Sequence, residues 1–486
     1  MDLPPVGTRI RLAGHSGTVR FVGNVDRTTG AWLGIEWDDP RRGKHGGCKE
    51  GKRYFSCRVP NAGSFIRPSA NIFYGASGAG VFSWSNRGRS LSLDDQDVAR
   101  CDPPGKIRET CPSIRGLDLS TSLIPSWDVV ALIAQELPTL QKLCLNRNRL
   151  QPATDFSVMK KAFLHLTELQ LNGTLLTWLE MQTATAAMPN LRLIEMGYNS
   201  LTRLQTATDK HPSRNDTIQV INLDSNACSD WMNIRESLSH YTSLQRLMVT
   251  SNCIDTIPFP EDPQQGLRTV KHISLSYNKI DAWSNIDALS SWCPGLETLT
   301  MTGNPLTSQV HSRPFTIARI PSLLALDGTT ISHKERADSE ILYLSYVIRE
   351  PGSEDQRRQA HPQWNNLCKK HGRPEDDAAK GNAPRDKLSQ RLIALNLYRS
   401  LSPNVGDVMQ EASAAEPLVL RVLPTMTLRS LRMKTCKTLK IKAIIQFWLK
   451  QTYGSPVELG TDRDQQNLDW LGLDDGATVV FHVMQQ

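Results

Sequence analysis

The middle of the chain repeats an eleven-residue pattern of leucine-like residues at nearly constant spacing, and this repeat constrains the fold more than any other feature. Six clear copies begin at Leu140, Leu191, Ile218, Leu244, Val270 and Leu296, and two weaker copies begin at Ile114 and Leu166. The eight starts are 25 to 27 residues apart. A period of this length is typical of a solenoid, in which each unit buries its apolar side chains only against its neighbours.

The copies follow LxxLxLxxNxL, the pattern of a leucine-rich repeat. We expect each copy to form one short strand with its apolar side chains pointing inward. The asparagine at the ninth position should lie where the chain turns, with its amide bonded to backbone groups that the stack leaves unpaired. These asparagines are Asn148, Asn199, Asn226, Asn252, Asn278 and Asn304, and Ser122 and Thr174 replace them in the weak copies. The segment "LLALDGTTISHKER" after the last copy resembles a closing cap, so residues 113–349 are predicted to be an α/β leucine-rich repeat domain with a C-terminal cap.

A solenoid of this kind is normally a binding surface and not a catalyst. The strand positions that should face outward carry a mixed set of side chains, with no column of charge and no cluster of His with Asp or Cys. They are Gln170, Glu195, Asn222, Met248, Ser274 and Thr300. This surface favours a protein partner over phosphate or metal.

The C-terminal part changes character after about residue 388. "RLIALNLY", "PLVLRVLP", "IIQFWLKQ" and "ATVVFHVMQ" read as strands, and a helix capped by Thr427 is expected between the second and third. The order strand, strand, helix, strand, strand predicts that residues 388–486 form an α+β ubiquitin-like β-grasp domain, with an unrelated small α+β domain as the alternative. The segment ends "VMQQ" without a terminal diglycine, so we expect a fixed module and not a conjugated tag.

Two segments are rich in Pro, Gly and charge and show little periodicity, which is typical of linkers. They are residues 76–112 and residues 350–387. Within the second, "WNNLCKK" is expected to form a brief helix.

Residues 1–75 are dense in short strands and turns, "TRIRL", "GTVRFVG", "AWLGIEWD", "RYFSCR" and "SFIRP", which is the pattern of a small all-β barrel. Twelve Lys and Arg face six Asp and Glu here, so this segment holds most of the net charge of +7 and suits an acidic partner. Five short motifs of this segment together resemble the CAP-Gly domain, a cytoskeleton-associated glycine-rich module. They are "GTVRFVG", "GAWLGIEWDD", "GKHGG", "YFSC" and "GSFIRP".

The CAP-Gly resemblance implies a groove for the acidic, aromatic-ended C-terminal tail of α-tubulin or of end-binding proteins. Lys44 would meet carboxylates, Trp32 and Phe65 would form apolar walls for the terminal ring, and Arg67 would add a second cation. Gly43, Gly46 and Gly47 would supply backbone angles with φ > 0 and a close approach of the peptide. Phe55 and Cys57 are expected in the core.

The loop departs from the GKNDG motif of that family at two positions. His45 stands where Asn is usual and Gly46 where Asp is usual. Histidine still donates a hydrogen bond, and it should make binding mildly pH-sensitive. The missing Asp removes a negative charge and leaves the loop looser. The alternative is a barrel kept for folding alone.

The order of the modules resembles that of the tubulin-specific chaperone E family over nearly the whole chain: a CAP-Gly domain, then leucine-rich repeats, then a ubiquitin-like domain. Residues 76–112 are the exception. The resemblance implies a non-enzymatic, cytoplasmic and cytoskeleton-associated chaperone without a cofactor. It would bind the tail and body of α-tubulin and, with tubulin cofactors B, C and D, assemble or dissociate the αβ heterodimer. The ubiquitin-like module would contact another cofactor or the proteasome.

Other functions find less support in the sequence. GxxxxGK[ST], GxSxG and HExxH are absent, no apolar run is long enough to span a membrane, and the ten scattered cysteines have no metal-ligand spacing and suit a reducing compartment. A nucleic-acid binder is disfavoured because Lys and Arg form no stripe. A microtubule-associated or proteasome-linked adaptor without folding activity is the main alternative, although no coiled-coil heptads are present.

Overall fold

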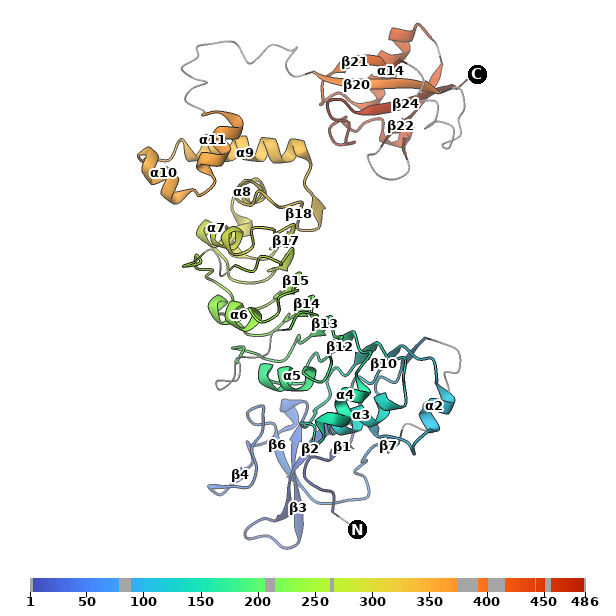
Figure 1. The fold of residues 1–486 in the computed structure, drawn as a ribbon, viewed down its shortest axis with the longest axis vertical. Coiled ribbons are helices and arrows are strands. Elements are labelled where there is room, and N and C mark those ends of the chain that lie inside the picture. Colours follow the sequence, from blue (N-terminus) through green and yellow to red (C-terminus); the bar gives the residue numbers. More distant parts are fainter. Residues whose placement is uncertain are drawn as a thin grey trace. The chain divides into compact units, whose positions relative to one another are not determined.

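The computed structural model describes residues 3–77, 89–205, 215–262, 266–373, 392–400, 416–441, 443–450 and 456–484. The chain divides into two compact units, Met1–Leu367 and Cys368–Gln486. The first unit holds an N-terminal β module and the repeats, and the second is a small mixed sheet with one helix (Figure 1).

The N-terminal module, residues 3–75, is built on an antiparallel sheet with the strand order β1-β2-β3-β6. Its elements are β1 (Arg9–Leu12), β2 (His15–Asn24), β3 (Ala31–Trp37), η1 (Pro40–Arg42), β4 (Cys48–Lys49), β5 (Lys52–Arg53) and β6 (Gly63–Ile66). One face of the sheet packs into a fully buried core around Ile10, Val19, Leu33 and Ile35.

One predicted strand of this module is wrong in part. In "RYFSCR" only Arg53 is in a strand, because the chain then leaves the sheet and lays the ring of Phe55 over β3. Gly34 makes room for that ring, since a Cβ there would lie 2.4 Å from Phe55 Cε1. Phe55 is 6% exposed, in agreement with its predicted place in the core.

The repeats form an 11-stranded sheet in which β8 to β18 run parallel and β19 turns back antiparallel. The strands are β8 (Ser90–Ser92), β10 (Gly116–Asp118), β11 (Lys142–Cys144), β12 (Glu168–Gln170), β13 (Leu193–Glu195), β14 (Val220–Asn222), β15 (Arg246–Met248), β16 (His272–Ser274), β17 (Thr298–Thr300), β18 (Ala325–Leu326) and β19 (Thr329–Thr330). All eight predicted copies supply one strand, so the solenoid prediction is confirmed.

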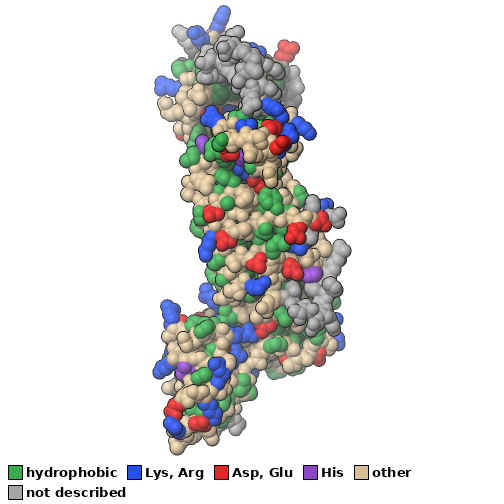
Figure 2. Space-filling view, turned by 90° about the vertical axis from the view of Figure 1, so that its left-hand side faces the viewer, with side chains coloured by type: hydrophobic (Ala, Val, Ile, Leu, Met, Phe, Trp, Pro, Cys, Tyr) green, Lys and Arg blue, Asp and Glu red, His purple; other side chains and the backbone are tan. Residues whose placement is uncertain are grey.

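Helices cover the other side of the stack, at the left in Figure 1, while the strands lie at the right. They are α3 (Trp127–Gln135), α4 (Phe156–Ala162), α5 (Trp178–Thr185), α6 (Trp231–Leu238), α7 (Trp283–Trp292) and α8 (Ser312–Arg319), with the 3-10 turn η3 (Pro305–Ser308) before α8. The six predicted outward-facing strand residues are all partly exposed. On the face of the repeats drawn in Figure 2, acidic and basic side chains are interspersed among apolar ones.

The repeat asparagines form the expected ladder of buried amides. Asn226 Nδ2 donates to the carbonyl of Met196, 3.0 Å away in the preceding repeat, and to that of Leu223 at 2.9 Å. Its Oδ1 accepts the backbone N–H of Leu201 at 3.0 Å. Asn252, Asn278 and Asn304 repeat this pattern. Each amide therefore satisfies backbone groups that the turn would leave unpaired.

The predicted linker 76–112 is wrong over its described residues after 88. β8 opens the repeat sheet, β9 (Val98–Arg100) pairs with β7 (Ala76–Ser77), and α2 (Lys106–Thr110) follows. Leu91 lies directly opposite Leu117 on β10, 26 residues later, so the solenoid begins one repeat earlier than predicted. Residues 78–88 lie outside the described part.

The predicted linker 350–387 is also wrong at its start. After the cap helix α9 (His333–Val347), whose N-cap is Ser332, come α10 (Glu354–Ala360) and α11 (Trp364–His371). The brief helix expected at "WNNLCKK" is thus confirmed. Trp364 is only 2% exposed, because it packs into the fold and donates its ring N–H to Glu354. The predicted linker residues 374–387 lie outside the described part.

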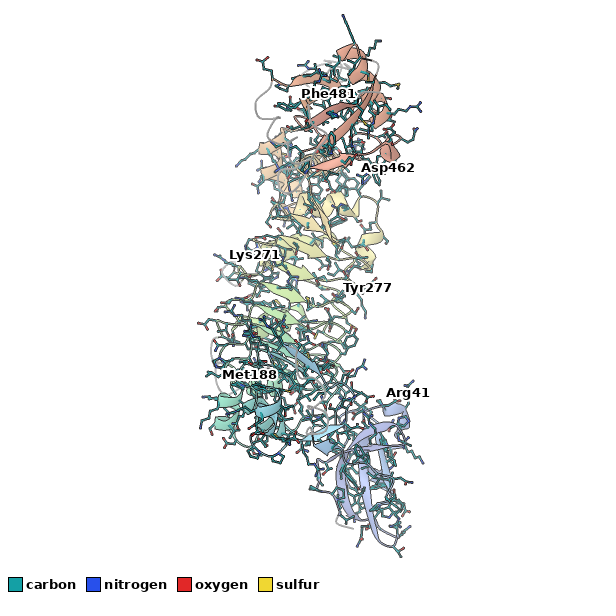
Figure 3. The ribbon with its side chains drawn as sticks, turned by 90° about the vertical axis from the view of Figure 1, so that its right-hand side faces the viewer. Arg41, Met188, Lys271, Tyr277, Asp462 and Phe481 are labelled. Carbon is teal, nitrogen blue, oxygen red and sulfur yellow. The ribbon has the colours of Figure 1, made fainter. Side chains whose placement is uncertain are left out.

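The C-terminal unit has the strand order β21-β20-β24-β22-β23, with β20 and β24 parallel in the centre, which is a β-grasp arrangement. Its elements are β20 (Ile393–Ser400), β21 (Leu418–Val422), α14 (Leu428–Leu439), β22 (Ile444–Leu449), β23 (Val457–Leu459), η5 (Thr461–Arg463) and β24 (Thr478–Met484). Thr427 caps α14 as predicted, and Phe481 of β24 belongs to the core under the helix (Figure 3). No helix in the described ranges is long and apolar enough to cross a membrane.

Candidate peptide-binding site

Strand register places three of the predicted site residues on one face of the N-terminal sheet. Gly34 of β3 lies opposite Phe65 of β6. Because side chains alternate along a strand, Trp32 shares this face with Phe65 and Arg67. The face is opposite to the one that packs on Leu33 and Ile35.

Phe65 is the centre of an aromatic cluster that the sequence did not reveal. Its ring centroid lies 5.0 Å from that of His45, 5.4 Å from Phe55, 5.5 Å from Tyr54 and 6.2 Å from Phe21. The pairs with Tyr54, Phe55 and Phe21 are edge-to-face, the arrangement that aromatic quadrupoles favour. Phe65 remains partly exposed, so one part of the ring faces solvent and the rest is already packed.

Trp32 and Arg67 form one composite surface. The guanidinium carbon of Arg67 lies 3.9 Å from the centre of the Trp32 ring, and Arg67 Nη1 donates to the carbonyl of Ala31 at 3.2 Å. The indole N–H of Trp32 donates to Thr28 Oγ1 at 2.8 Å, which fixes the ring. A guanidinium stacked on an indole keeps its outward N–H groups available for a carboxylate.

The three glycines of the loop have three different roles, which corrects the expectation of φ > 0 at each. Only Gly47 has a positive φ, of 93°, and a Cβ there would also lie 2.0 Å from the carbonyl oxygen of Phe55. Gly43 has a φ of −66°, but a Cβ there would lie 2.0 Å from the carbonyl oxygen of Asn61. A Cβ added at Gly46 would have no heavy atom within 4 Å, so Gly46 is the one glycine of these three that leaves open space beside the backbone.

His45 helps to hold the loop. Its Nδ1 accepts the backbone N–H of Gly47 at 3.0 Å, so the neutral ring carries its proton on Nε2. Burial, and then the charge of Lys44, lower the pKa of His45 below its usual value. The backbone of His45 pairs with Gly63, which joins the loop to β6. The ring can donate a hydrogen bond to a ligand only from Nε2.

Lys44 is exposed, and its ammonium makes no hydrogen bond or ion pair with the described residues. The structure therefore brings an unpaired lysine, a partly exposed Phe65 and the stacked Arg67 and Trp32 onto one small module. Cys57, also predicted in the core, is only half-buried, and burial raises the pKa of its thiol to about 11.

Tyr54 is the residue of this face that sequence reasoning missed. Its ring packs on Phe65, and its hydroxyl accepts the N–H of Asp26 at 2.9 Å. Lys52 Nζ lies 5.1 Å from the ring centre and pairs with Asp26 at 2.9 Å. The signal was available in "KRYF", where two basic residues and two aromatic residues follow the glycine loop.

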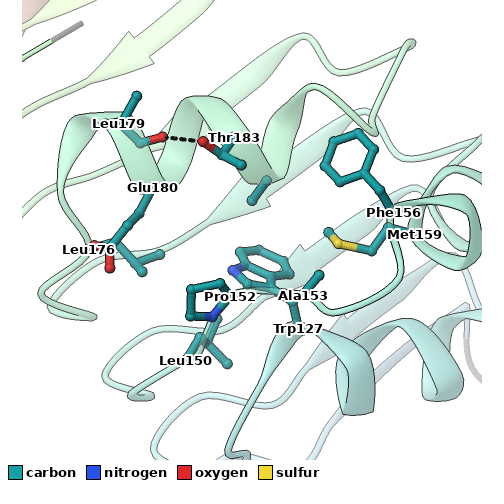
Figure 4. Close-up of a pocket in the computed structure, with 11 residues that line it drawn as sticks. Trp127, Leu150, Pro152, Ala153, Phe156, Met159, Leu176, Leu179, Glu180 and Thr183 are labelled. Atoms are coloured by element: carbon teal, nitrogen blue, oxygen red, sulfur yellow. Dashed lines mark hydrogen bonds between the residues drawn. The ribbon is translucent and has the colours of Figure 1, made fainter. Parts of the chain in front are cut away.

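A separate apolar pocket of about 220 Å³ opens between α4 and α5 (Figure 4). Phe156 and Met159 come from α4, Leu179 and Thr183 from α5, and Trp127 forms the floor. Glu180 is the one charged residue that lines it. The pocket offers apolar contact and no set of acid, base and nucleophile.

The CAP-Gly domain family matches residues 6–71 of the chain. The human protein named tubulin-specific chaperone E is 30% identical over 451 residues, which cover 81% of this chain and 84% of the human one. The chain belongs to the tubulin-specific chaperone E family.

Other members of the tubulin-specific chaperone E family extend the match. The rat tubulin-specific chaperone E is 28% identical over 99% of both chains, and the tubulin-folding cofactor E of Arabidopsis thaliana is 24% identical over 98% of this chain and 97% of its own. The family resemblance seen in the order of the modules is therefore confirmed.

Two solved structures are similar to parts of this family member. The C-terminal ubiquitin-like domain of mouse tubulin-specific chaperone E shares 15% identity and covers 21% of this chain and 96% of its own, with a TM-score of 0.17. The Drosophila melanogaster SNF/U2A' complex shares 19% identity and covers 36% of this chain and 87% of that chain, with a TM-score of 0.26. The fold of each module is assigned from its own strand order and register and not from these scores.

Proposed function

We propose that this protein is a tubulin-folding chaperone without enzymatic activity that binds α-tubulin. The membership of the family supports this class of function. The single observation that supports the mechanism is that one module carries the unpaired Lys44, the aromatic face of Phe65, and the stacked Trp32 and Arg67. An acidic chain end places carboxylates on the cations and its terminal ring on the aromatic face.

The partners divide among the modules. Residues 1–75 hold the α-tubulin tail through Trp32, Lys44, His45 and Arg67 together with Phe65 and the glycines of the loop. The repeats, which begin at β8 and end with the cap, hold the body of α-tubulin. Residues 388–486 contact one of the tubulin cofactors B, C and D, or the proteasome. Several weak contacts on one chain raise avidity while each remains reversible, which suits a factor that must release its client.

With these cofactors the protein assembles or dissociates the αβ-tubulin heterodimer, and it acts in the cytoplasm near the cytoskeleton. The second candidate is a microtubule-associated or proteasome-linked adaptor that binds the same tail and has no folding activity. The ubiquitin-like β-grasp unit favours keeping this candidate, because such a unit is a common docking module.

Capture of α-tubulin tests the tail site. Wild-type chain and Lys44→Ala are each offered α-tubulin with and without its last aromatic residue, and Lys161→Ala, an exposed lysine on α4, serves as the matched control. We expect weaker capture when either Lys44 or the terminal ring is removed, and residual capture through the repeats. Equal capture in all four combinations would remove this site from the mechanism.

Mixing the purified chain with tubulin dimers and cofactor B separates chaperone from adaptor. If the protein is a chaperone, the dimers should dissociate, which is measured as loss of the heterodimer peak in size-exclusion chromatography. Dimers that stay intact while remaining bound to the chain would favour the adaptor.

A further inference from the structure

A second cleft, of about 550 Å³, lies between the N-terminal module and the first repeats, both of which belong to the same compact unit. The module contributes His15, Asp38 and Arg41 to its walls, and the repeats contribute Arg147, Arg149 and Tyr198. No part of the tail site on β3 and β6 lines this cleft.

Direct contacts join the two walls. Arg58 of the module pairs with Glu180 of α5 at 2.8 Å and donates to the carbonyl of Leu175, also at 2.8 Å. Arg11 pairs with Asp95, beyond β8, at 2.7 Å. The side chains of Arg58 and Glu180 are 31% and 29% exposed, so the pair is partly shielded from solvent. The cleft therefore has a defined geometry and is not an accidental gap between loosely tethered modules.

The charges inside the cleft do not cancel. Asp38 is shared by Arg9, which is buried, and by Arg149, whose Nε lies 3.8 Å away. Burial would raise the pKa of Asp38, but these two guanidinium groups lower it, so the carboxylate is ionised at neutral pH. Asp39 pairs with Arg41 at 3.0 Å. Both carboxylates that line the cleft are thus already paired with arginines, and Arg147 comes in addition to these pairs.

Arg147 is the surplus cation of the cleft. Its guanidinium makes no hydrogen bond or ion pair with any residue that the structure describes. It also borders a neighbouring hollow that Asp94 and Asp118 line. Asp118 already accepts the N–H of Ser120 at 2.9 Å, and neither carboxylate pairs with Arg147.

Arg147 and Tyr198 occupy equivalent positions of their repeats, on the left-handed residue that precedes each repeat asparagine, with φ of 61° and 58°. Gly173 occupies the same position in the repeat between them. A Cβ added at Gly173 would lie 3.4 Å from Arg147 Cγ, so the aliphatic part of the arginine side chain lies across the glycine. Tyr198 is 66% exposed. Two repeats of a parallel sheet separate the two side chains by about 10 Å, which an extended peptide spans in three residues.

Arg41 of η1 lines the cleft and is close in sequence to Lys44 of the tail site. Arg41 precedes Lys44 by three residues, so the chain between them extends over about 10 Å at most. We propose that this cleft binds the acidic residues that precede the aromatic end of the client tail, with Arg147 as the main cation and Tyr198 as a surface for the peptide. This inference rests on the proposed function and names a second subsite for the same acidic ligand.

Two synthetic peptides test the proposal, both about twelve residues long and both ending in Glu-Glu-Tyr, with the upstream residues all Glu in one and all Gln in the other. A peptide of this length spans up to about 40 Å, enough to leave Lys44 and cross the cleft. Wild-type full-length chain should bind the Glu peptide more tightly in fluorescence polarisation. Arg147→Ala should reduce this preference by about three- to tenfold, and raised salt should abolish it.

Matched controls lie on the same solenoid. Arg192 is an exposed arginine just before β13, and Tyr277 shares the left-handed position and the exposure of Tyr198, at 62%, three repeats further along. Figure 3 shows Tyr277 on the same right-hand side of the unit as Arg41. Arg192→Ala and Tyr277→Ala should keep the full preference for the Glu peptide, while Tyr198→Ala should weaken binding of that peptide.

The outcomes separate this proposal from the tail site. If Lys44→Ala weakens both peptides while Arg147→Ala changes neither, the cleft proposal is overturned and the tail site stands. If Arg147→Ala removes the Glu preference while Lys44→Ala changes nothing, the tail site fails and the cleft stands. Equal loss with Arg192→Ala and Arg147→Ala would show a general charge effect and would also overturn the cleft.

Discussion

His45 shows how one substitution in a glycine loop changes its mechanics. Its ring accepts the N–H of Gly47 and packs 5.0 Å from Phe65, so it braces the loop against the aromatic face. The residue types of this site could be read from the sequence, but this packing could not. It depends on β6 and the 43–47 loop meeting across the pairing of His45 with Gly63, which no local pattern specifies.

The lowered pKa of His45 predicts a pH effect on the module. Near neutral pH both the folded and the unfolded chain carry a neutral ring. As the pH falls below about 6.5, the unfolded chain binds a proton first, so the folded module loses stability until the lower folded pKa is passed. The opening free energy of the β2 and β3 amides, obtained from hydrogen exchange corrected for the intrinsic exchange rate at each pH, should therefore fall more between pH 7 and pH 5.5 in the wild type than in His45→Asn. Parallel pH profiles would show that His45 does not brace the loop.

Gly47 and Gly46 form a matched pair of adjacent glycines. Gly47→Ala should destabilise the module by about 2 kcal/mol, because it forces a side chain into a left-handed backbone and against the Phe55 carbonyl. Gly46→Ala meets open space and should change the opening free energy, measured by hydrogen exchange, by less than about 0.5 kcal/mol. The account of the loop is wrong if the two variants behave alike.

At the scale of the element, the constant period of the repeats determined how many strands could be predicted from the sequence. Eight strands followed from leucine spacing alone, because each copy kept its inward apolar positions. β8 was missed because its copy has Gln96 where six of the other eight copies have asparagine, although Leu91 and Leu93 keep the register. β23 was missed because a strand of three residues, "VEL", carries no alternation that can be recognised.

The asparagine ladder predicts a graded loss of stability. Asn226→Ala leaves the carbonyls of Met196 and Leu223 and the N–H of Leu201 without the amide, so it should cost about 3 kcal/mol in urea unfolding of the repeats. Asn148→Ala should cost less, because Asn148 Oδ1 accepts no hydrogen bond from the described residues. Equal losses of stability in the two variants would mean that the hydrogen bonds accepted by the asparagine side-chain oxygen contribute nothing.

At the scale of the whole molecule, the first unit couples two modules that composition had separated. Residues 76–112 read as a linker because Pro, Gly and charge are frequent there, yet the described part adds β8 to the sheet. The contacts of Arg58 and Arg11 with the repeats were not foreseen, because each residue alone looks like an ordinary surface arginine. Fixing the N-terminal module beside the repeats is consistent with the proposed binding of two regions of one client.

A solution structure of the full-length chain bound to an acidic peptide that ends in tyrosine would show directly whether the N-terminal module binds such a chain end. Selectively labelled Lys44, Arg67, Trp32 and Phe65 would report contacts in nuclear magnetic resonance spectra. The account predicts contacts from the peptide carboxylates to the Lys44 ammonium and the Arg67 guanidinium, and from the terminal ring to Trp32 or Phe65. A bound peptide that leaves all four side chains unperturbed would contradict it.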